Sequence, residues 1–170
     1  LRLAENTVDA IITSPPYLNA IDYMRGHRLS LVWLGYPLSE LRDVRSTSIG
    51  SETIRRARLT KISGARNRGP DARTQRLIDQ YIHDLGQLTR ELKRVAKRGA
   101  KVCVISANSN LRGYEVRTNS LIHAAAAGAG LTLVDEKIRL IEKKRRYLPT
   151  TNNRALKLRM MEEHIQYFVA

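Results

Sequence analysis

Apolar and polar residues alternate along parts of the chain in a way that predicts β-strands. Runs rich in β-branched residues, bounded by turn-forming residues, are typical of strands in a buried sheet. Four segments have this character: residues 8–13, 101–106, 131–141 and 164–169. Because the first two are short and almost wholly apolar, we expect them to lie in the interior of the sheet.

Apolar residues recur at spacings of three and four in two longer segments, which predicts amphipathic helices. The clearer one covers residues 77–95, with Gly99 expected to end it, and the second covers residues 116–128. A weaker pattern over residues 22–34 predicts another helix. Ser39 is expected to cap a short helix that continues to Val44.

The predicted order is strand, helix, strand, helix, strand, strand. Parallel strands need a long crossover, which the two helices supply, so the fold class is α/β. The last two strands have no helix between them and are expected to form an antiparallel hairpin at one edge of the sheet. A chain of 170 residues is long enough for one domain with a real core.

The tetrapeptide Ser14-Pro15-Pro16-Tyr17 follows directly on the first predicted strand. Each proline fixes its own φ and donates no backbone hydrogen bond, so the loop is stiff. Such a loop presents a hydroxyl, a carbonyl and an aromatic ring in a preset arrangement. We interpret it as a site that accepts hydrogen bonds from an amino group and stacks on a flat ring.

The formal net charge of the chain narrows the class of partner. The chain has 30 Lys and Arg residues and 16 Asp and Glu residues, so its net charge is +14. That excess favours a polyanion such as nucleic acid, although a solvated basic surface is the alternative.

Residues 45–76 form a basic, glycine-interrupted insertion that we expect to be mobile. Its arginines Arg55, Arg56 and Arg58, and the run Lys143, Lys144, Arg145 and Arg146, are candidate phosphate contacts.

Residues 9–17 resemble the catalytic strand and loop of S-adenosylmethionine-dependent methyltransferases that modify exocyclic amino groups in DNA. The resemblance implies a Rossmann-like fold, of which this chain would be the carboxyl-terminal half. It further implies that the Ser14 hydroxyl and the Pro15 carbonyl accept hydrogen bonds from a flipped base on which Tyr17 stacks. The serine form of the loop is associated with cytosine but also occurs in adenine enzymes.

Asn19, Asp22 and Tyr23 follow the loop closely and are candidates for contact with base or cofactor. Helix capping by Asp22 is an equal alternative. The family's role in restriction and modification is an expectation from resemblance alone. Methylation of RNA or of a protein amide, and a non-catalytic nucleic-acid-binding module, remain open as other functions.

The glycine-rich turn with which this family binds S-adenosylmethionine is missing. Gly128-x-Gly130 follows a helix rather than a strand and is interpreted as a helix stop. We therefore expect the chain to be a partial domain whose cofactor turn lies in an N-terminal segment or a partner chain. The alternative is a permuted order in which the turn follows Ala170.

No metal site is predicted, since the four histidines have no partner at ligand spacing. The single cysteine, Cys103, lies within a predicted strand, where it is expected to be a buried residue rather than a nucleophile. One cysteine excludes an internal disulfide and fits a reducing, cytoplasmic compartment. No stretch has the length or composition of a membrane span or signal peptide.

Overall fold

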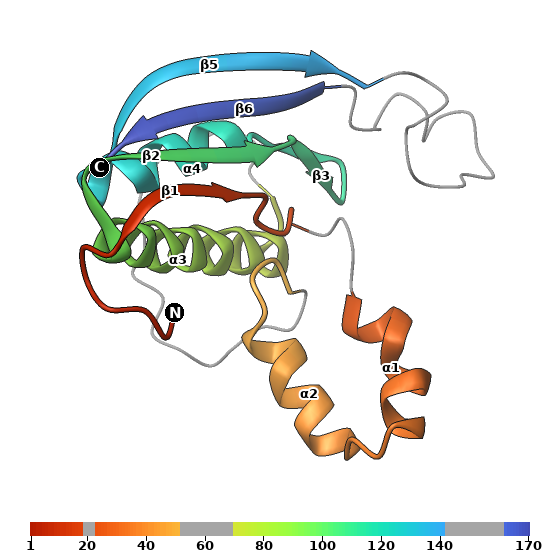
Figure 1. The fold of residues 1–170 in the computed structure, drawn as a ribbon. Coiled ribbons are helices and arrows are strands. Elements are labelled where there is room, and N and C mark those ends of the chain that lie inside the picture. Colours follow the sequence, from red (N-terminus) through yellow and green to blue (C-terminus); the bar gives the residue numbers. More distant parts are fainter. Residues whose placement is uncertain (19–22, 52–69, 142–161) are drawn as a thin grey trace.

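A four-stranded sheet with helices packed against it forms the body of the protein (Figure 1). The computed structural model describes residues 1–18, 23–51, 70–141 and 162–170. The strands lie in the order β1–β2–β6–β5, where the bounds are β1 Val8–Thr13, β2 Ala96–Ser106, β6 Glu162–Val169 and β5 Thr132–Leu140. All four predicted strands are present, and β1 has the predicted bounds.

The two kinds of strand pairing agree with the prediction of an α/β class. β1 and β2 are parallel, and the connection between them contains helix α3, Ala72–Val95. β5 and β6 form the expected antiparallel hairpin at one edge, and β6 also pairs antiparallel with β2. Because parallel neighbours need a crossover while antiparallel ones do not, this order follows from where the helices occur in the sequence.

One face of the sheet carries the hydrophobic core. Buried residues alternate with more exposed ones along β2 and β6, as expected when one face of a sheet is covered. Helix α3 and helix α4, Thr118–Gly128, pack on that covered face; α4 lies behind β2 and β6 in Figure 1. The largest fully buried side chains of this core include Leu77, Tyr81, Leu85, Leu111, Ile122 and Phe168.

Helix α3 differs from its prediction in where it begins and in the role of Gly99. It begins five residues earlier than expected, at Ala72, because the Asp71 carboxylate accepts the amide protons of Arg73 and Thr74, both at 2.9 Å. It ends at Val95, well before Gly99. Gly99 has φ +81° and lies within β2, where the register with β1 shifts, so it forms a bulge and does not end a helix.

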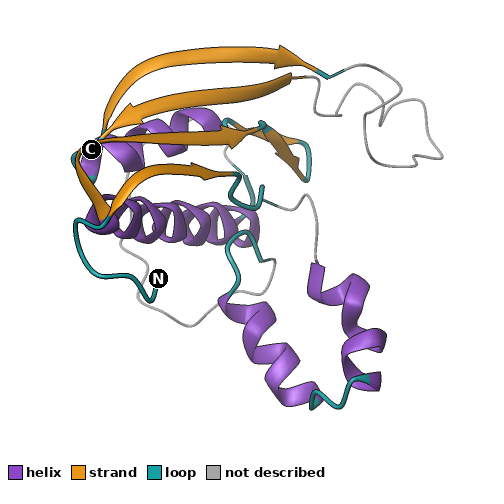
Figure 2. Cartoon of the chain, in the orientation of Figure 1, coloured by secondary structure: helices purple, strands orange, loops and turns teal. Residues whose placement is uncertain are grey.

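Two shorter helices, α1 (Tyr23–Trp33) and α2 (Leu38–Thr47), form an antiparallel pair that we call the α1–α2 hairpin. It projects from the body below the end of β1 (Figure 2). The prediction that Ser39 caps α2 is wrong, because Pro37 occupies the cap position and makes no side-chain cap bond. Pro37 is extended, and the helix begins at Leu38, two residues earlier than a Ser39 cap would place it.

A second, two-stranded sheet was not predicted. It consists of β3 (Ser109–Leu111) and β4 (Tyr114–Val116), joined by a turn at Arg112-Gly113. The Asn110 side chain closes this turn by accepting the Gly113 amide proton at 2.8 Å. The segments are too short to show a period in the sequence.

Most of the predicted basic insertion, residues 52–69, lies outside the described residues. Arg45, at one end of the predicted segment, is part of α2. Arg73 and Arg76, at its other end, belong to α3. Within the described residues, no helix is both long enough and apolar enough to cross a membrane.

Candidate active site

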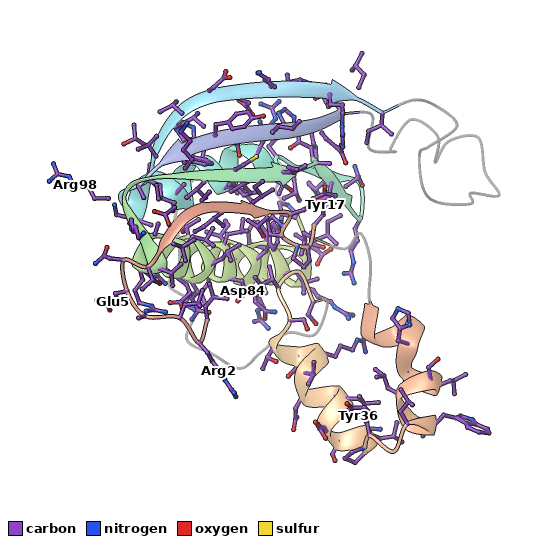
Figure 3. The ribbon with its side chains drawn as sticks, in the orientation of Figure 1. Arg2, Glu5, Tyr17, Tyr36, Asp84 and Arg98 are labelled. Carbon is purple, nitrogen blue, oxygen red and sulfur yellow. The ribbon has the colours of Figure 1, made fainter. Side chains whose placement is uncertain are left out.

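The loop Ser14-Pro15-Pro16-Tyr17 lies at the carboxyl end of β1, directly after the last register pair of β1 with β2, Thr13 with Val104. In open α/β sheets, ligands bind outside the carboxyl ends of parallel strands. Figure 3 places Tyr17 beside the ends of these two strands. The sequence therefore delivers the loop to the edge of the sheet where a substrate would be expected.

The loop alternates between buried and exposed residues. Pro15 is buried and Leu18, which follows the loop, is 1% exposed and belongs to the core. Ser14 and Pro16 are exposed, whereas Tyr17 is half-buried. Packing of Pro15 and Leu18 in the protein interior holds the loop backbone in place at two points. Ser14, between β1 and Pro15, is exposed to solvent.

Tyr81, in the middle of α3, holds the loop from the core side. Its hydroxyl donates a hydrogen bond to the Pro16 carbonyl at 3.1 Å, and its side chain is 1% exposed. Burial raises the pKa of Tyr81, with smaller contributions from Tyr17 and Asp84. The Thr118 hydroxyl lies near the phenol and opposes the rise, although it is outside hydrogen-bond geometry. Tyr81 is therefore a neutral donor at ordinary pH.

Gly50, just after α2, contacts the loop from another side. A Cβ at this position would lie 3.0 Å from the Tyr17 carbonyl oxygen and 3.4 Å from its carbon. Gly50 also has φ +75°, a conformation that glycine adopts at little cost. The segment that follows α2 therefore returns to the backbone of the loop at Tyr17.

This geometry defines what the loop can offer a ligand. The Pro16 carbonyl accepts the hydrogen bond from Tyr81. This bond does not involve the two predicted acceptors, the Ser14 hydroxyl and the Pro15 carbonyl. Tyr17 also makes an interaction of its own. The roles of these residues toward a base remain predictions.

The structure does not describe the side chains of the other predicted contact residues. Tyr23 is the first residue of α1, but its side chain is not described. The rest lie outside the described residues: Asn19, Asp22, Arg55, Arg56, Arg58, Lys143, Lys144, Arg145 and Arg146.

Cysteine and histidine positions agree in part with the sequence interpretation. Cys103 is only half-buried, on the face of the sheet away from α3 and α4, and desolvation raises the pKa of its thiol, which disfavours the reactive thiolate. His83 and His123 are exposed on their helices. Among the residues that the structure describes, no group of His, Cys, Asp and Glu could hold a metal ion.

Sequence reasoning missed a partly buried polar cluster at the start of α4. His164 Nδ1 lies 3.0 Å from Glu136 Oε1 and 3.3 Å from the Asn119 side-chain amide, while Gln166 donates to the Asn119 carbonyl at 3.2 Å. His164 pairs in register with Ser106 at the end of β2. The cluster joins β5 and β6 to the first turn of α4. Only the alternation of polar residues along 162–169 could have indicated it.

Comparison with known proteins begins with the sequence. No family model matches it. The chain is 24% identical over 164 residues to the type II methyltransferase M.BsoBI of Geobacillus stearothermophilus, in a match that covers 76% of this chain. The matched part is 32% of the length of M.BsoBI.

Solved structures give the fold. The PvuII DNA methyltransferase, described as cytosine-N4-specific, matches with a TM-score of 0.53 and 10% identity, over 99% of this chain and 44% of its own. A weaker likeness, at a TM-score of 0.48 and 13% identity, is to the TTHA0409 protein of Thermus thermophilus complexed with S-adenosyl-L-methionine; it covers 99% of this chain and 47% of that one. The chain therefore has a Rossmann-like fold similar to that of the PvuII enzyme, and it spans less than half the length of that enzyme.

Proposed function

We propose that this chain carries the catalytic loop of a DNA methyltransferase that acts on the exocyclic amino group of cytosine or adenine, with S-adenosylmethionine as methyl donor. The observation that carries the proposal is the Ser14-Pro15-Pro16-Tyr17 loop at the carboxyl end of a parallel strand. The likeness to M.BsoBI in sequence and to the PvuII enzyme in fold supports it. The net charge of +14 favours nucleic acid over an acidic or neutral protein as substrate.

The loop suits the chemistry of an aromatic amine, which is a poor nucleophile because its lone pair is delocalised into the ring. Two acceptors, the Ser14 hydroxyl and the Pro15 carbonyl, would each take one amino hydrogen. The nitrogen then becomes more tetrahedral and its lone pair becomes available. Tyr17 would stack on a base turned out of the duplex and fix its orientation, so that positioning supplies much of the acceleration.

The described residues do not fit the methyl donor. The family's donor site uses a glycine-rich turn between a strand and a helix. Here neither strand-to-helix connection, from β1 to α1 or from β4 to α4, contains a glycine. S-adenosylmethionine would supply an electrophilic methyl group, and this chain's own part is to hold and orient the amine.

We further propose that the donor site is formed by strands that add to the free edge of β1. Among the described residues, β1 pairs only with β2. Ile12 on β1 is 79% exposed, although parallel sheets are normally covered on both faces. A sheet extended past β1 would place donor-binding loops beside Ser14 and Tyr17, at the same edge.

Methyl transfer tests the proposal directly. Labelled S-adenosylmethionine is offered with duplex DNA, RNA and protein to the wild type and to Ser14→Ala and Tyr17→Ala. We expect methylation of DNA amino groups and a loss of about 100-fold or more in either variant, as when one preorganised transition-state contact is removed. Both variants should keep the wild-type thermal unfolding temperature, because neither side chain is fully buried.

Matched controls are Ser30→Ala, on the exposed surface of α1, and Tyr36→Phe, at the far end of the hairpin. Neither should change activity. Full activity of Tyr17→Ala would contradict the proposal, and methylation of RNA or protein but not DNA would redirect it. Calorimetry with S-adenosylmethionine, on this chain and on a version that includes further strands, separates an incomplete donor site from a module that binds no donor.

A further inference from the structure

The contact between Tyr81 and the loop joins two parts of the chain that are 65 residues apart in sequence. Tyr81 lies in the apolar stripe of α3, between the buried residues Leu77 and Leu85. A phenylalanine would fill that place in the core equally well. The hydroxyl instead reaches the Pro16 carbonyl at 3.1 Å, at the carboxyl edge of the sheet.

Because both residues are prolines, this single hydrogen bond also restricts the orientation of the neighbouring Pro15 carbonyl. The Pro16 ring fixes φ of that residue, so ψ of Pro16 is the one free rotation between the Pro15 and Pro16 carbonyls. Holding the Pro16 carbonyl on Tyr81 restricts this rotation. The direction of the Pro15 carbonyl is then set as well, although Tyr81 does not touch it.

Gly50 lies close to another side of the loop, because a Cβ added there would be 3.0 Å from the Tyr17 carbonyl oxygen. Tyr81 and Gly50 therefore limit movement of the Pro16–Tyr17 backbone in two directions. Because Tyr81 is buried and its pKa is raised, the phenol stays protonated and keeps donating throughout the neutral and mildly alkaline range.

We propose that Tyr81 is a positioning residue for methyl transfer. Its hydroxyl holds the Pro16 carbonyl so that the Pro15 carbonyl and the Ser14 hydroxyl are aimed at the substrate amino group. The inference rests on the proposed function, and it assigns to a core helix a specific part in setting up the acceptor pair.

Tyr81→Phe removes the hydroxyl and keeps the ring. We expect kcat to fall by about 10-fold or more while KM for DNA stays within about twofold, because the lost interaction aims the acceptors and does not bind the duplex. Amide hydrogen exchange at Tyr17 and Leu18 should become faster. Tyr36→Phe, which removes an exposed phenol hydroxyl, is the matched control and should change neither quantity.

An unchanged kcat in Tyr81→Phe overturns the inference, and so does a fall in kcat with loop exchange that stays at the wild-type rate. If the variant does not fold, a tyrosine with a fully fluorinated ring at position 81 keeps the shape and strongly lowers the pKa of the phenol. Its kcat should then fall, and amide exchange at Tyr17 should become faster, at an alkaline pH where the wild-type phenol stays protonated; a kcat equal to that of the wild type throughout this range contradicts the inference. Failure of the proposed function is distinct, because it appears as absent methyl transfer in the wild type.

Discussion

Helix α3 and the α1–α2 hairpin both border the Ser14-Pro15-Pro16-Tyr17 loop, but they are packed very differently. Along α3, Leu77 and Tyr81 are each 1% exposed and Leu85 is 0% exposed. In the described part of the hairpin, Leu41 is the one buried residue. Most stability of a helix in a protein comes from packing of its apolar face. The helix farther away in sequence is therefore the one that fixes the loop.

The hairpin leaves its apolar residues at the surface. Trp33 is 92% exposed, Leu29 75% and Leu34 74%. Its tip lies far from the sheet, as the position of Tyr36 in Figure 3 shows. The hairpin therefore contributes to the site chiefly where it leaves the loop, after Leu18, and where it returns, at Gly50. Substitutions in the two regions should have effects of very different size.

The largest effect is expected in α3. Leu85→Ala should lower the free energy of unfolding by about 2–5 kcal/mol, the range for removing a fully buried leucine side chain. Leu38→Ala in α2, where the leucine is 48% exposed, is the matched control and should lower it by less than about 1 kcal/mol. Urea unfolding measures both. Equal losses would show that the hairpin is packed as tightly as the body.

An intermediate effect is expected where the hairpin meets the loop. Gly50→Ala adds a methyl group 3.0 Å from the Tyr17 carbonyl oxygen at a residue with φ +75°. The strained conformation alone costs about 1–2 kcal/mol, and the backbone contact forces the loop to shift. We therefore expect lower stability together with reduced methyl transfer.

Gly113→Ala separates the two causes. Gly113 has φ +91° in the turn between β3 and β4, and nothing lies within 4 Å of its added Cβ. It should lose a similar amount of stability in thermal unfolding and keep full methyl transfer. If both variants were equally active, contact of Gly50 with the loop would have no functional role.

The smallest effect is expected at the tip of the hairpin. Trp33→Ala should change the free energy of unfolding by no more than about 0.5 kcal/mol, as is usual for surface positions. A 92% exposed side chain makes few contacts that the substitution could remove. Denaturant unfolding of the isolated chain is the measurement. A loss above about 2 kcal/mol, the scale of a buried side chain, would mean that the tip is packed in solution.

The sequence was a good guide wherever a period is long or an end is chemically marked. β1 was predicted with its observed bounds, because a β-branched run stops at two prolines. The β5–β6 hairpin and the parallel β1–β2 pair followed from where helices occur. The stop of α4 at Gly128 and the left-handed Gly130 also agree with the prediction.

Prediction failed where tertiary contacts decide the outcome. Gly99 was assigned to a helix end, but its positive φ serves a bulge that depends on pairing with β1. The first turn of α3 has no apolar pattern and is set by the Asp71 cap. Tyr81 could not be separated from the core residues around it, because a buried tyrosine and its hydrogen-bond partner are 65 residues apart.

Among the described residues, one edge of β1 has no strand paired with it, and this affects how the protein can be handled. An edge strand offers a row of backbone N–H and C=O groups to any extended chain, and charged residues or covering loops usually block such pairing. Asp9, with its ion pair to Lys97 at 2.7 Å, is one charge on this strand, whereas Ile12 adds apolar surface. During synthesis, the β1 edges of two copies of the chain can therefore pair with each other. Yield should depend on concentration more steeply than stability alone would predict.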